Sequence, residues 1–136
     1  MKHPCKHGVI HESFQSFIFL GYKMCLRVNL NGIDSGCGSH VSMFVHLMQG
    51  DFDSFIDWPF PHSIELTIMD QNSKDPQHVK NSLHARPTLQ AFLRPKTPRN
   101  QKGYGYVEMI PHQTLWQKGY LQNDTMIVRV DVRPAK

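Results

Sequence analysis

One short segment holds the residue types that are most able to recognise a ligand. Residues 102–109 run Lys-Gly-Tyr-Gly-Tyr-Val-Glu-Met, which nearly matches an RNA-recognition signature, although Met109 replaces its terminal aromatic residue. In a strand, Tyr104 and Tyr106 share one face on which bases could stack. Basic charge is supplied at Arg94, Lys96, Arg99 and Lys102. RNA binding is therefore one hypothesis, but the sequence shows neither of the two amphipathic helices that such a module packs behind its sheet.

The same segment also fits an edge strand that binds a peptide. Gly103 and Gly105 carry no side chains on one face, so another backbone could approach there. On the opposite face lie Lys102, Tyr104 and Tyr106. A purely structural interpretation is that the tyrosines only cover a core. Spacing alone does not separate the peptide-binding strand from the packing strand.

Other reactive residue types do not form recognisable sites. The His3-x-Cys5-x-His7 cluster looks like a metal site, but no ligand pairs at tetrahedral, loop-compatible spacing accompany it. We find no nucleophile turn, phosphate-binding loop or recognisable pair of carboxylates. The sequence therefore predicts no catalytic residue, no metal and no cofactor, in a chain that is not an enzyme.

Composition points to one globular domain. The chain has 136 residues, of which 40% are hydrophobic, so it can bury a core without disulfides or a structural metal. No apolar run approaches the roughly 18 residues of a membrane helix, and Glu12 and Gln15 interrupt any signal-peptide core. We therefore predict a cytoplasmic protein without direct membrane insertion, whose three cysteines stay reduced. The net charge of +4 suits either nucleic acid or an acidic peptide.

Period-two alternation dominates the chain and predicts strands. Residues 22–30 place Tyr22, Met24, Leu26, Val28 and Leu30 on one face. Turn residues then separate this strand from residues 40–48, so the two should form an antiparallel hairpin. Further strands are predicted over residues 64–68, 105–110 and 124–132.

Helical signals are weak in this chain. Residues 88–93 and 111–116 could each make at most two turns, because prolines limit them. Residues 70–84 are polar and irregular, as expected for a connection between sheets. Alternating strands without a long amphipathic helix predict an all-β fold, a two-sheet antiparallel β-sandwich.

Several ordered motifs resemble the C-terminal TRAF (MATH) domain of the tumour-necrosis-factor-receptor-associated factors. They comprise residues 21–27, 46–53, 58–60 and 70–71; later segments, residues 92–95, 98–100, 102–107 and 123–125, resemble one member of the family in particular. The resemblance implies an eight-stranded antiparallel sandwich over residues 9–132, with a divergent lead of residues 1–8 and a tail of residues 133–136. Since the family's first strand has no counterpart in the sequence, about seven of the eight strands should be present.

The resemblance implies an adaptor domain in TNF-receptor and Toll/interleukin-1 type innate immune signalling. Such a domain binds Pro-x-Glu-x-x-aromatic or acidic peptides, so the implied partners are cytoplasmic receptor tails and adaptor or kinase peptides, and no nucleic acid. Arg27 matches the arginine that meets the last peptide residue, and Tyr104 and Tyr106 match the walls of the proline pocket. The other residues that match the peptide site are Leu83, Gln90, Ala91, Lys102, Gly103 and, near the peptide, Val9.

The sequence departs from the family pattern in two further respects. Residues 11–20 differ from the family's second strand. The RING domain, zinc fingers and coiled coil of full-length relatives do not occur in this sequence, so neither ubiquitin transfer nor trimerisation is predicted for it, and a homotrimer would need a coiled coil from elsewhere. Two alternatives therefore stay open: an RNA-binding module that uses residues 102–107, and an incomplete, non-binding fragment of a RING-type ubiquitin ligase.

Overall fold

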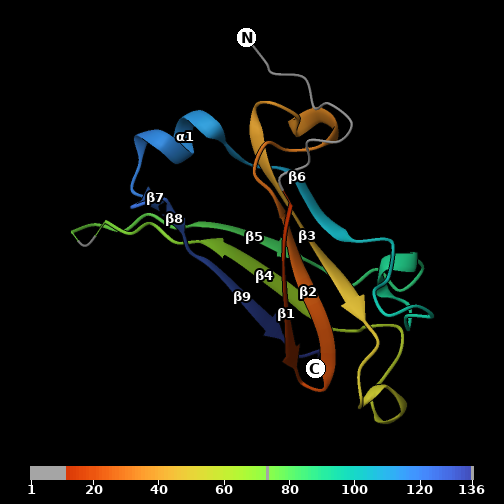
Figure 1. Ribbon diagram of the computed structural model, residues 1–136. Coiled ribbons are helices and arrows are strands. Elements are labelled where there is room, and N and C mark those ends of the chain that lie inside the picture. Colours follow the sequence, from red (N-terminus) through yellow and green to blue (C-terminus); the bar gives the residue numbers. More distant parts are fainter. Residues whose placement is uncertain (1–11, 73, 136) are drawn as a thin grey trace.

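Two antiparallel sheets face each other in the computed structural model, which describes residues 12–72 and 74–135 (Figure 1). Sheet A has the strand order β1-β2-β3-β6, and sheet B has the order β5-β4-β9. Their strands are β1 (Glu12–Phe19), β2 (Tyr22–Asn29), β3 (His40–Met48), β4 (Ser63–Ile68), β5 (Val79–Leu83), β6 (Tyr104–Pro111) and β9 (Val128–Arg133). This arrangement confirms the predicted all-β antiparallel sandwich; within the described residues its two main sheets hold seven strands. The domain limits at residues 9 and 132 stay predictions.

Helical structure is confined to short connections. These are the 3-10 turns η1 (Asp34–Gly36), η2 (Asp53–Phe55) and η3 (Gln90–Phe92), and the α-helix α1 (His112–Gln117). A small ribbon of β7 (Leu121–Gln122) and β8 (Thr125–Met126) follows α1. Across the described ranges, no helix is long and apolar enough to span a membrane.

The hairpin predicted between residues 22–30 and 40–48 is confirmed. β2 pairs with β3 in a register that places Leu26 opposite Val45 and Val28 opposite Met43. Its connection needs a glycine, because Gly32 has a φ of +75° and a Cβ there would lie 2.1 Å from the carbonyl oxygen of Gly36. The turn residues thus fix the register that brings the apolar faces of the two strands together.

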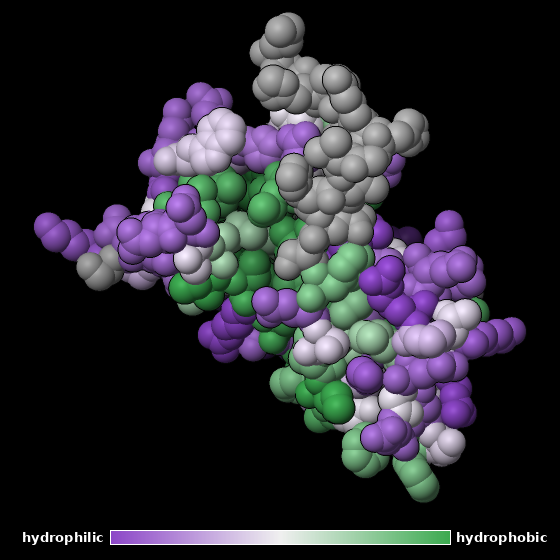
Figure 2. All heavy atoms as spheres, viewed as in Figure 1, coloured by the Kyte–Doolittle hydropathy of each residue, from purple (hydrophilic) through white to green (hydrophobic). Residues whose placement is uncertain are grey.

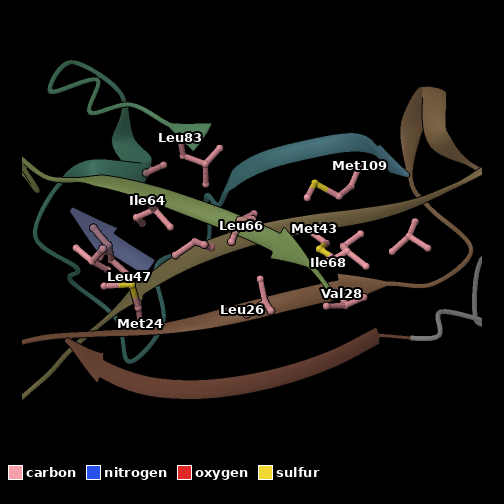
Figure 3. Packing of buried hydrophobic residues seen from close by; sticks show 14 of the residues in the cluster. Met24, Leu26, Val28, Met43, Leu47, Ile64, Leu66, Ile68, Leu83 and Met109 are labelled. Carbon is pink, nitrogen blue, oxygen red and sulfur yellow. The ribbon is translucent and has the colours of Figure 1, made fainter. Parts of the chain in front are cut away.

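The core lies between the inner faces of the two sheets (Figure 3). Met24, Leu26, Val28, Met43 and Leu47 come from sheet A, and they meet Ile64, Leu66, Ile68 and Leu83 from sheet B. Each fully buried side chain of this kind stabilises the fold by about 1.5–3 kcal/mol. The alternation in the sequence therefore predicts the inner faces of β2, β3 and β4 correctly, except at Leu30, which lies beyond β2 and is exposed.

Two strands depart from the sequence prediction. β5 lies within residues 70–84, which we expected to be only a connection; it is an edge strand paired with β4 alone. Because only Leu83 in it is fully buried, β5 lacks a strong apolar alternation. The predicted strand at residues 124–132 is divided at Ile127, since β8 pairs with β7 whereas β9 pairs with β4.

The divergent segment at residues 11–20 forms a regular strand. β1 pairs with β2 over its whole length, from Glu12 opposite Asn29 to Phe19 opposite Tyr22. Of the predicted helices, residues 111–116 correspond to α1, while residues 88–93 contain only the turn η3. The prediction for the cysteines is wrong in one place: Cys25 is a buried free thiol, but Cys37 is disulfide-bonded. The His3-x-Cys5-x-His7 cluster and Val9 lie outside the described residues.

Candidate functional site

β6 is one of the two outer strands of sheet A, and among the described residues it pairs with β3 alone. Along β3, the N–H and C=O groups of successive residues point alternately toward β2 and toward β6. The Leu47 carbonyl accepts a hydrogen bond from the Asn100 N–H at 2.8 Å, so the backbone groups of Leu47 point to the β6 side. Val45, two residues earlier, therefore directs its backbone to the same side, toward its partner Tyr104. By this alternation the N–H and C=O of Gly105 point to the open edge. We call the surface around this strand the β6 edge.

Tyr104 and Tyr106 lie on the inner face of sheet A, because they pair with Val45 and Met43. The Tyr104 ring is 5.1 Å from the Phe92 ring between centroids. It closes a cavity of about 10 Å³ that Leu83 and Ala91 also line. This space is near the minimum for one water molecule, so a ligand would contact the outer surface of these side chains.

The hydroxyl of Tyr106 bridges the two sheets. It donates a hydrogen bond to the backbone carbonyl of Ser82 in β5, next to Leu83. β5 also contacts β6, so the inner side of the β6 edge is built from both sheets. Three of the residues that we predicted from distant parts of the sequence, Leu83, Ala91 and Tyr104, thus lie together, and Tyr106 is anchored beside them.

Arg27 lies on the other face of sheet A. One row across the sheet runs from Phe14 through Arg27 and Phe44 to Gly105. The Arg27 guanidinium carbon is 4.3 Å from the centre of the Phe44 ring, which is cation–π geometry. Because Gly105 has no side chain, the row of side chains ends at Phe44, one strand before the β6 edge.

At Gly103 and Gly105, atoms of β3 occupy the space that a side chain would need. A Cβ on Gly105 would lie 1.9 Å from the carbonyl oxygen of Met43 and 2.7 Å from the Cα of Phe44, both in β3. At Gly103 a Cβ would lie 2.5 Å from Nε2 of His46. We expected these glycines to let a ligand backbone approach; the space at each is filled from β3 instead.

Lys102, Gln90 and Ala91 lie around the end of β6. Lys102 and Gln90 are exposed, and Ala91 is buried. The Asn100 side-chain amide donates to the Gln90 carbonyl at 2.9 Å, which ties η3 to the segment before β6. Beside this point is a hollow of about 470 Å³, whose lining includes Gln90, Asn100 and the basic residues Arg94 and Lys96.

A second arginine besides Arg27 lies over the outer face of sheet A, above β1. Arg99 stacks on Phe14, with 4.1 Å between the guanidinium carbon and the ring centre. Beneath this layer, burial raises the pKa of the Cys25 thiol, while the charges of Arg99 and Arg27 act in the opposite direction. Because this thiol is 2% exposed, it is a packing residue and not a nucleophile.

Sequence reasoning missed several residues that shape this edge. Phe92 packs on Tyr104, Phe44 supports Arg27, and the His46 ring occupies the space at Gly103. His46 is 2% exposed, and its Nδ1 lies 2.8 Å from the Asn100 carbonyl oxygen. Phe44 and His46 alternate with the core residues of β3, so their burial on the outer face gives no sequence signal. His46 is contacted by Asn100 and lies against Gly103, and Phe44 is covered by Arg27.

Comparisons with known proteins agree with the fold. A family model described as TRAF/meprin, MATH domain, matches residues 11–129. TNF receptor-associated factor 6-A of Xenopus laevis is 45% identical over 114 residues, and TNF receptor-associated factor 6 of Homo sapiens is 42% identical over 114 residues. Each alignment covers 82% of this chain but only 20% and 22% of those proteins. The chain therefore spans about a fifth of their length.

One solved structure extends the agreement to the arrangement of the strands. Notothenia coriiceps TRAF5 superimposes with a TM-score of 0.85 at 34% sequence identity. That superposition covers 96% of this chain and 65% of the TRAF5 chain. The predicted family resemblance is confirmed by both the sequence relatives and the structure.

Proposed function

The chain belongs to the TRAF/meprin MATH domain family, and on this premise we propose that it is a non-enzymatic adaptor domain that binds short peptides along the β6 edge. The preferred ligand is an extended Pro-x-Glu-x-x-aromatic or acidic peptide. Its partners are the cytoplasmic tails of receptors, and adaptor or kinase segments, in TNF-receptor and Toll/interleukin-1 type signalling. These partners are proposed from the family, since the chain spans only about a fifth of its relatives.

One observation carries this proposal: the two halves of the predicted site lie on opposite faces of sheet A. Tyr104 and Tyr106 are on the inner face of β6, while Arg27 of β2 lies on the outer face, in the row that continues through Phe44 to Gly105. A peptide that adds to β6 directs alternate side chains to the two faces. The proline and the glutamate of the motif are two residues apart and share the tyrosine side. The final residue, three beyond the glutamate, points to the Arg27 side.

The charge of the surface supports a ligand with acidic groups. The peptide glutamate lies near Lys102 and the main-chain N–H groups of Gln90 and Ala91, which begin the turn η3 and need external acceptors. Arg94 and Lys96 line the adjoining hollow. Val9 belongs to the proposed contact set by its match to the family motif alone.

The RNA-binding alternative is less well supported. A base-stacking platform needs aromatic rings on an exposed sheet face. Here Tyr104 packs on Phe92, and Tyr106 is hydrogen-bonded to Ser82, between the two sheets. These contacts support a role for the tyrosines as one wall of a peptide site.

Titration calorimetry of the purified chain tests the proposal. The ligand is a Pro-x-Glu-x-x-Tyr peptide, and the control is the same peptide with alanine in place of the glutamate. We expect saturable and weak binding, because a short peptide buries little area and a single site lacks the avidity of an oligomer. The control should bind at least about tenfold more weakly, because it lacks a charge-assisted hydrogen bond.

The two ways of failing have different meanings. A chain that unfolds cooperatively but does not bind would contradict the peptide site. A chain that neither binds nor unfolds cooperatively would support the incomplete-fragment hypothesis. Equal binding of the two peptides would contradict the glutamate specificity while leaving the β6 edge as a peptide-binding surface.

A further inference from the structure

Positive charge is concentrated in one segment of the chain. Residues 76–107 hold six basic residues and no acidic residue, whereas the rest of the chain has more acidic than basic residues. The second half of this segment contains η3 and leads into β6. Figure 2 shows hydrophilic side chains gathered on the side of the molecule where Figure 1 draws the chain before β6. Such a local excess of positive charge attracts an anionic ligand.

The hollow of about 470 Å³ beside η3 lies within this segment, and we call it the basic hollow. Arg94 and Lys96 supply its charge, and no carboxylate of the described residues lines it. Across residues 12–72 and 74–135, neither cation forms an ion pair. The Arg94 guanidinium donates a long hydrogen bond of 3.4 Å to the Ser54 hydroxyl, which leaves its charge uncompensated. The neutral lining includes hydroxyl and amide groups of Thr88, Thr97, Gln90 and Gln101.

The walls of the basic hollow are held by hydrogen bonds to β3 and η3. The Gln49 N–H, directly after β3, donates to the Pro98 carbonyl at 3.0 Å, and the Asn100 N–H donates to the Leu47 carbonyl at 2.8 Å. The Asn100 side chain also donates to the Gln90 carbonyl at 2.9 Å. These walls are therefore fixed within the folded chain, and binding does not have to order them, which favours affinity.

The basic hollow lies where the proposed peptide continues beyond its glutamate. In the function proposed above, the peptide proline lies at Tyr104 and Tyr106 and the glutamate at Lys102, so the peptide runs antiparallel to β6. Its next residues therefore pass Gln101 and Asn100, which line the hollow. In an extended peptide, the second x after the glutamate shares the side of the glutamate and lies about 6.6 Å further along. The first x faces the opposite side.

The groups in the basic hollow fit a phosphate better than a carboxylate. A phosphorylated serine or threonine carries a charge of about −1.5 to −2 at pH 7 and three acceptor oxygens. Two cations can therefore neutralise one phosphate, and the planar Arg94 guanidinium can donate to two of its oxygens. The hydroxyl and amide groups of the lining can supply further hydrogen bonds. A carboxylate has a single charge and two oxygens, so it would leave part of the positive charge uncompensated.

We propose that the basic hollow binds the phosphate of a peptide ligand that is phosphorylated at the second x of Pro-x-Glu-x-x-aromatic. The phosphate contacts Arg94 and Lys96, while the glutamate stays at Lys102. Phosphorylation of the partner therefore strengthens its binding at the β6 edge. This inference rests on the function proposed above, and it adds a second anionic group to the ligand.

Titration calorimetry of the full chain tests the effect of the phosphate. The peptides are Pro-Ala-Glu-Ala-pSer-Tyr and the same sequence with an unmodified serine. The phosphopeptide should bind about tenfold more tightly, which corresponds to about 1.4 kcal/mol. Added salt should reduce this gain, because the contacts are exposed to solvent. A glutamate in place of the phosphoserine should gain only about two- to threefold, because it carries one charge.

A double variant tests the basic hollow itself. In Arg94→Gln combined with Lys96→Gln, the ratio of the affinities for the phosphorylated and unmodified peptides should fall from about ten to about one. The matched control is Lys80→Gln combined with Arg129→Gln, which removes the same charge from a separate hollow on sheet B and should keep the ratio. All four side chains are exposed, so both variants should fold, checked by cooperative unfolding.

A peptide isomer tests the position of the phosphate without changing the protein. Pro-Ala-Glu-pSer-Ala-Tyr has the same composition and charge, but its phosphate is on the first x and faces the opposite side. It should bind the wild type at least about threefold more weakly than the second-x phosphopeptide. Equal or tighter binding of this isomer would overturn the proposal. An affinity ratio that stays near ten in the Arg94→Gln, Lys96→Gln variant would overturn it too.

The unmodified peptide distinguishes the failure of this inference from the failure of the proposed function. If the unmodified peptide binds in a glutamate-dependent way and the phosphate adds no affinity, the basic hollow is not a phosphate site, while the β6 edge stays a peptide site. If neither peptide binds a chain that unfolds cooperatively, both proposals are wrong.

Discussion

The two sheets end in open strands that are finished in different ways. At β6, the neighbouring strand occupies the space of the missing side chains, since His46 fills the space at Gly103 and the β3 backbone lies against Gly105. At β9, an outer strand of sheet B in the described part of the chain, the neighbouring space is a hollow of about 270 Å³ whose lining includes Leu26, Val28, Leu121 and Met126; we call it the β9 hollow. The β6 edge is thus a rigid surface with charged and aromatic groups, whereas the β9 edge adjoins apolar side chains. The first suits recognition of particular side chains, and at the second β9 shares a hollow with the β7–β8 ribbon.

The rigidity of the β6 edge predicts the largest effect. Gly105→Val would drive its side chain into the Met43 carbonyl and the Phe44 Cα, so we expect a loss of about 3 kcal/mol in the free energy of unfolding. Urea denaturation measures it. The control is Glu108→Val on the same strand, because Glu108 is exposed and should tolerate valine. If Gly105→Val lowers the free energy of unfolding by less than about 1 kcal/mol, β3 can shift away from β6 and this edge is not rigid.

Recognition at the β6 edge should depend on both faces of the strand. Arg27→Ala and Tyr106→Ala should each weaken binding of the Pro-x-Glu-x-x-Tyr peptide about tenfold, or about 1.4 kcal/mol, without unfolding the domain. Calorimetry measures the affinity, and Arg129→Ala at the β9 edge is the matched control. Unchanged affinity in both variants would contradict the assignment of the site.

Asp70 should make the wall of the β9 hollow sensitive to acid. Hydrogen bonds from the Gln77 and Asn72 N–H groups hold the pKa of this carboxyl below its ordinary value of 3.8. Its folded pKa is depressed, so its contribution to stability is present above pH 3.8 and is lost as the pH falls through the lower, folded value. Asp70→Asn should therefore lower the free energy of unfolding at pH 7. The difference from the wild type should shrink as the pH falls below the folded pKa of Asp70.

The effect of Asp70 should reach the hollow through its neighbours. Asp70 lies beside Gly119, where a Cβ would be 2.4 Å from Oδ1, and Gln71 donates to the carbonyls of Tyr120 and Thr125. These contacts hold the β7–β8 ribbon that supplies Leu121 and Met126. Unfolding curves across acidic pH measure the effect, with the exposed Asp75→Asn as control. Parallel curves for Asp70→Asn and the wild type would contradict it.

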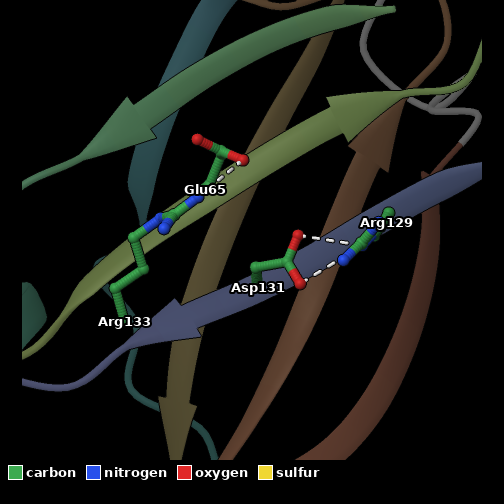
Figure 4. A network of polar contacts seen from close by, with 4 residues as sticks. All are labelled: Glu65, Arg129, Asp131 and Arg133. Carbon is green, nitrogen blue, oxygen red and sulfur yellow. Dashed lines mark hydrogen bonds and ion pairs between the residues drawn. The ribbon is translucent and has the colours of Figure 1, made fainter.

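The smallest effect is expected at the charged face of β9. Arg129 is 65% exposed in its ion pair with Asp131, and pairs of this kind contribute about 0–1 kcal/mol. Arg129→Ala should therefore change the free energy of unfolding by less than about 0.5 kcal/mol, measured in urea. A loss above about 1 kcal/mol would mean that this pair, which lies along β9 in Figure 4, supports the fold of the strand.

The fold was predictable where one face of a strand is buried along its length. Residues 22–30 and 40–48 show that alternation, and they form the central pair of sheet A. β5 was not predictable, because it exposes Lys80 and Ser82 at an edge and buries only Leu83 fully. The outer-face burial of Phe44 and His46 was also not predictable, since it depends on contacts with Arg27 and with Asn100 and Gly103, which are distant in the sequence.

The candidate site divides in the same way. The motif at residues 102–107 singled out Lys102, Tyr104 and Tyr106, but not the faces that they occupy in the folded chain. The family resemblance assigned four further residues to the site: Arg27, Leu83, Gln90 and Ala91. The structure places Leu83, Ala91 and Tyr104 in one cluster and Arg27 on the opposite face.

The sequence by itself determined the all-β class, the central hairpin and the family, because alternation and turn residues act within a few positions of one another. The tertiary structure decided which strands became edges, how the space at Gly103 and Gly105 was used, and that β1, β2 and β9 line one hollow. These features depend on how two sheets of unequal width pack together. Such packing joins residues far apart in the chain, and no local pattern records it.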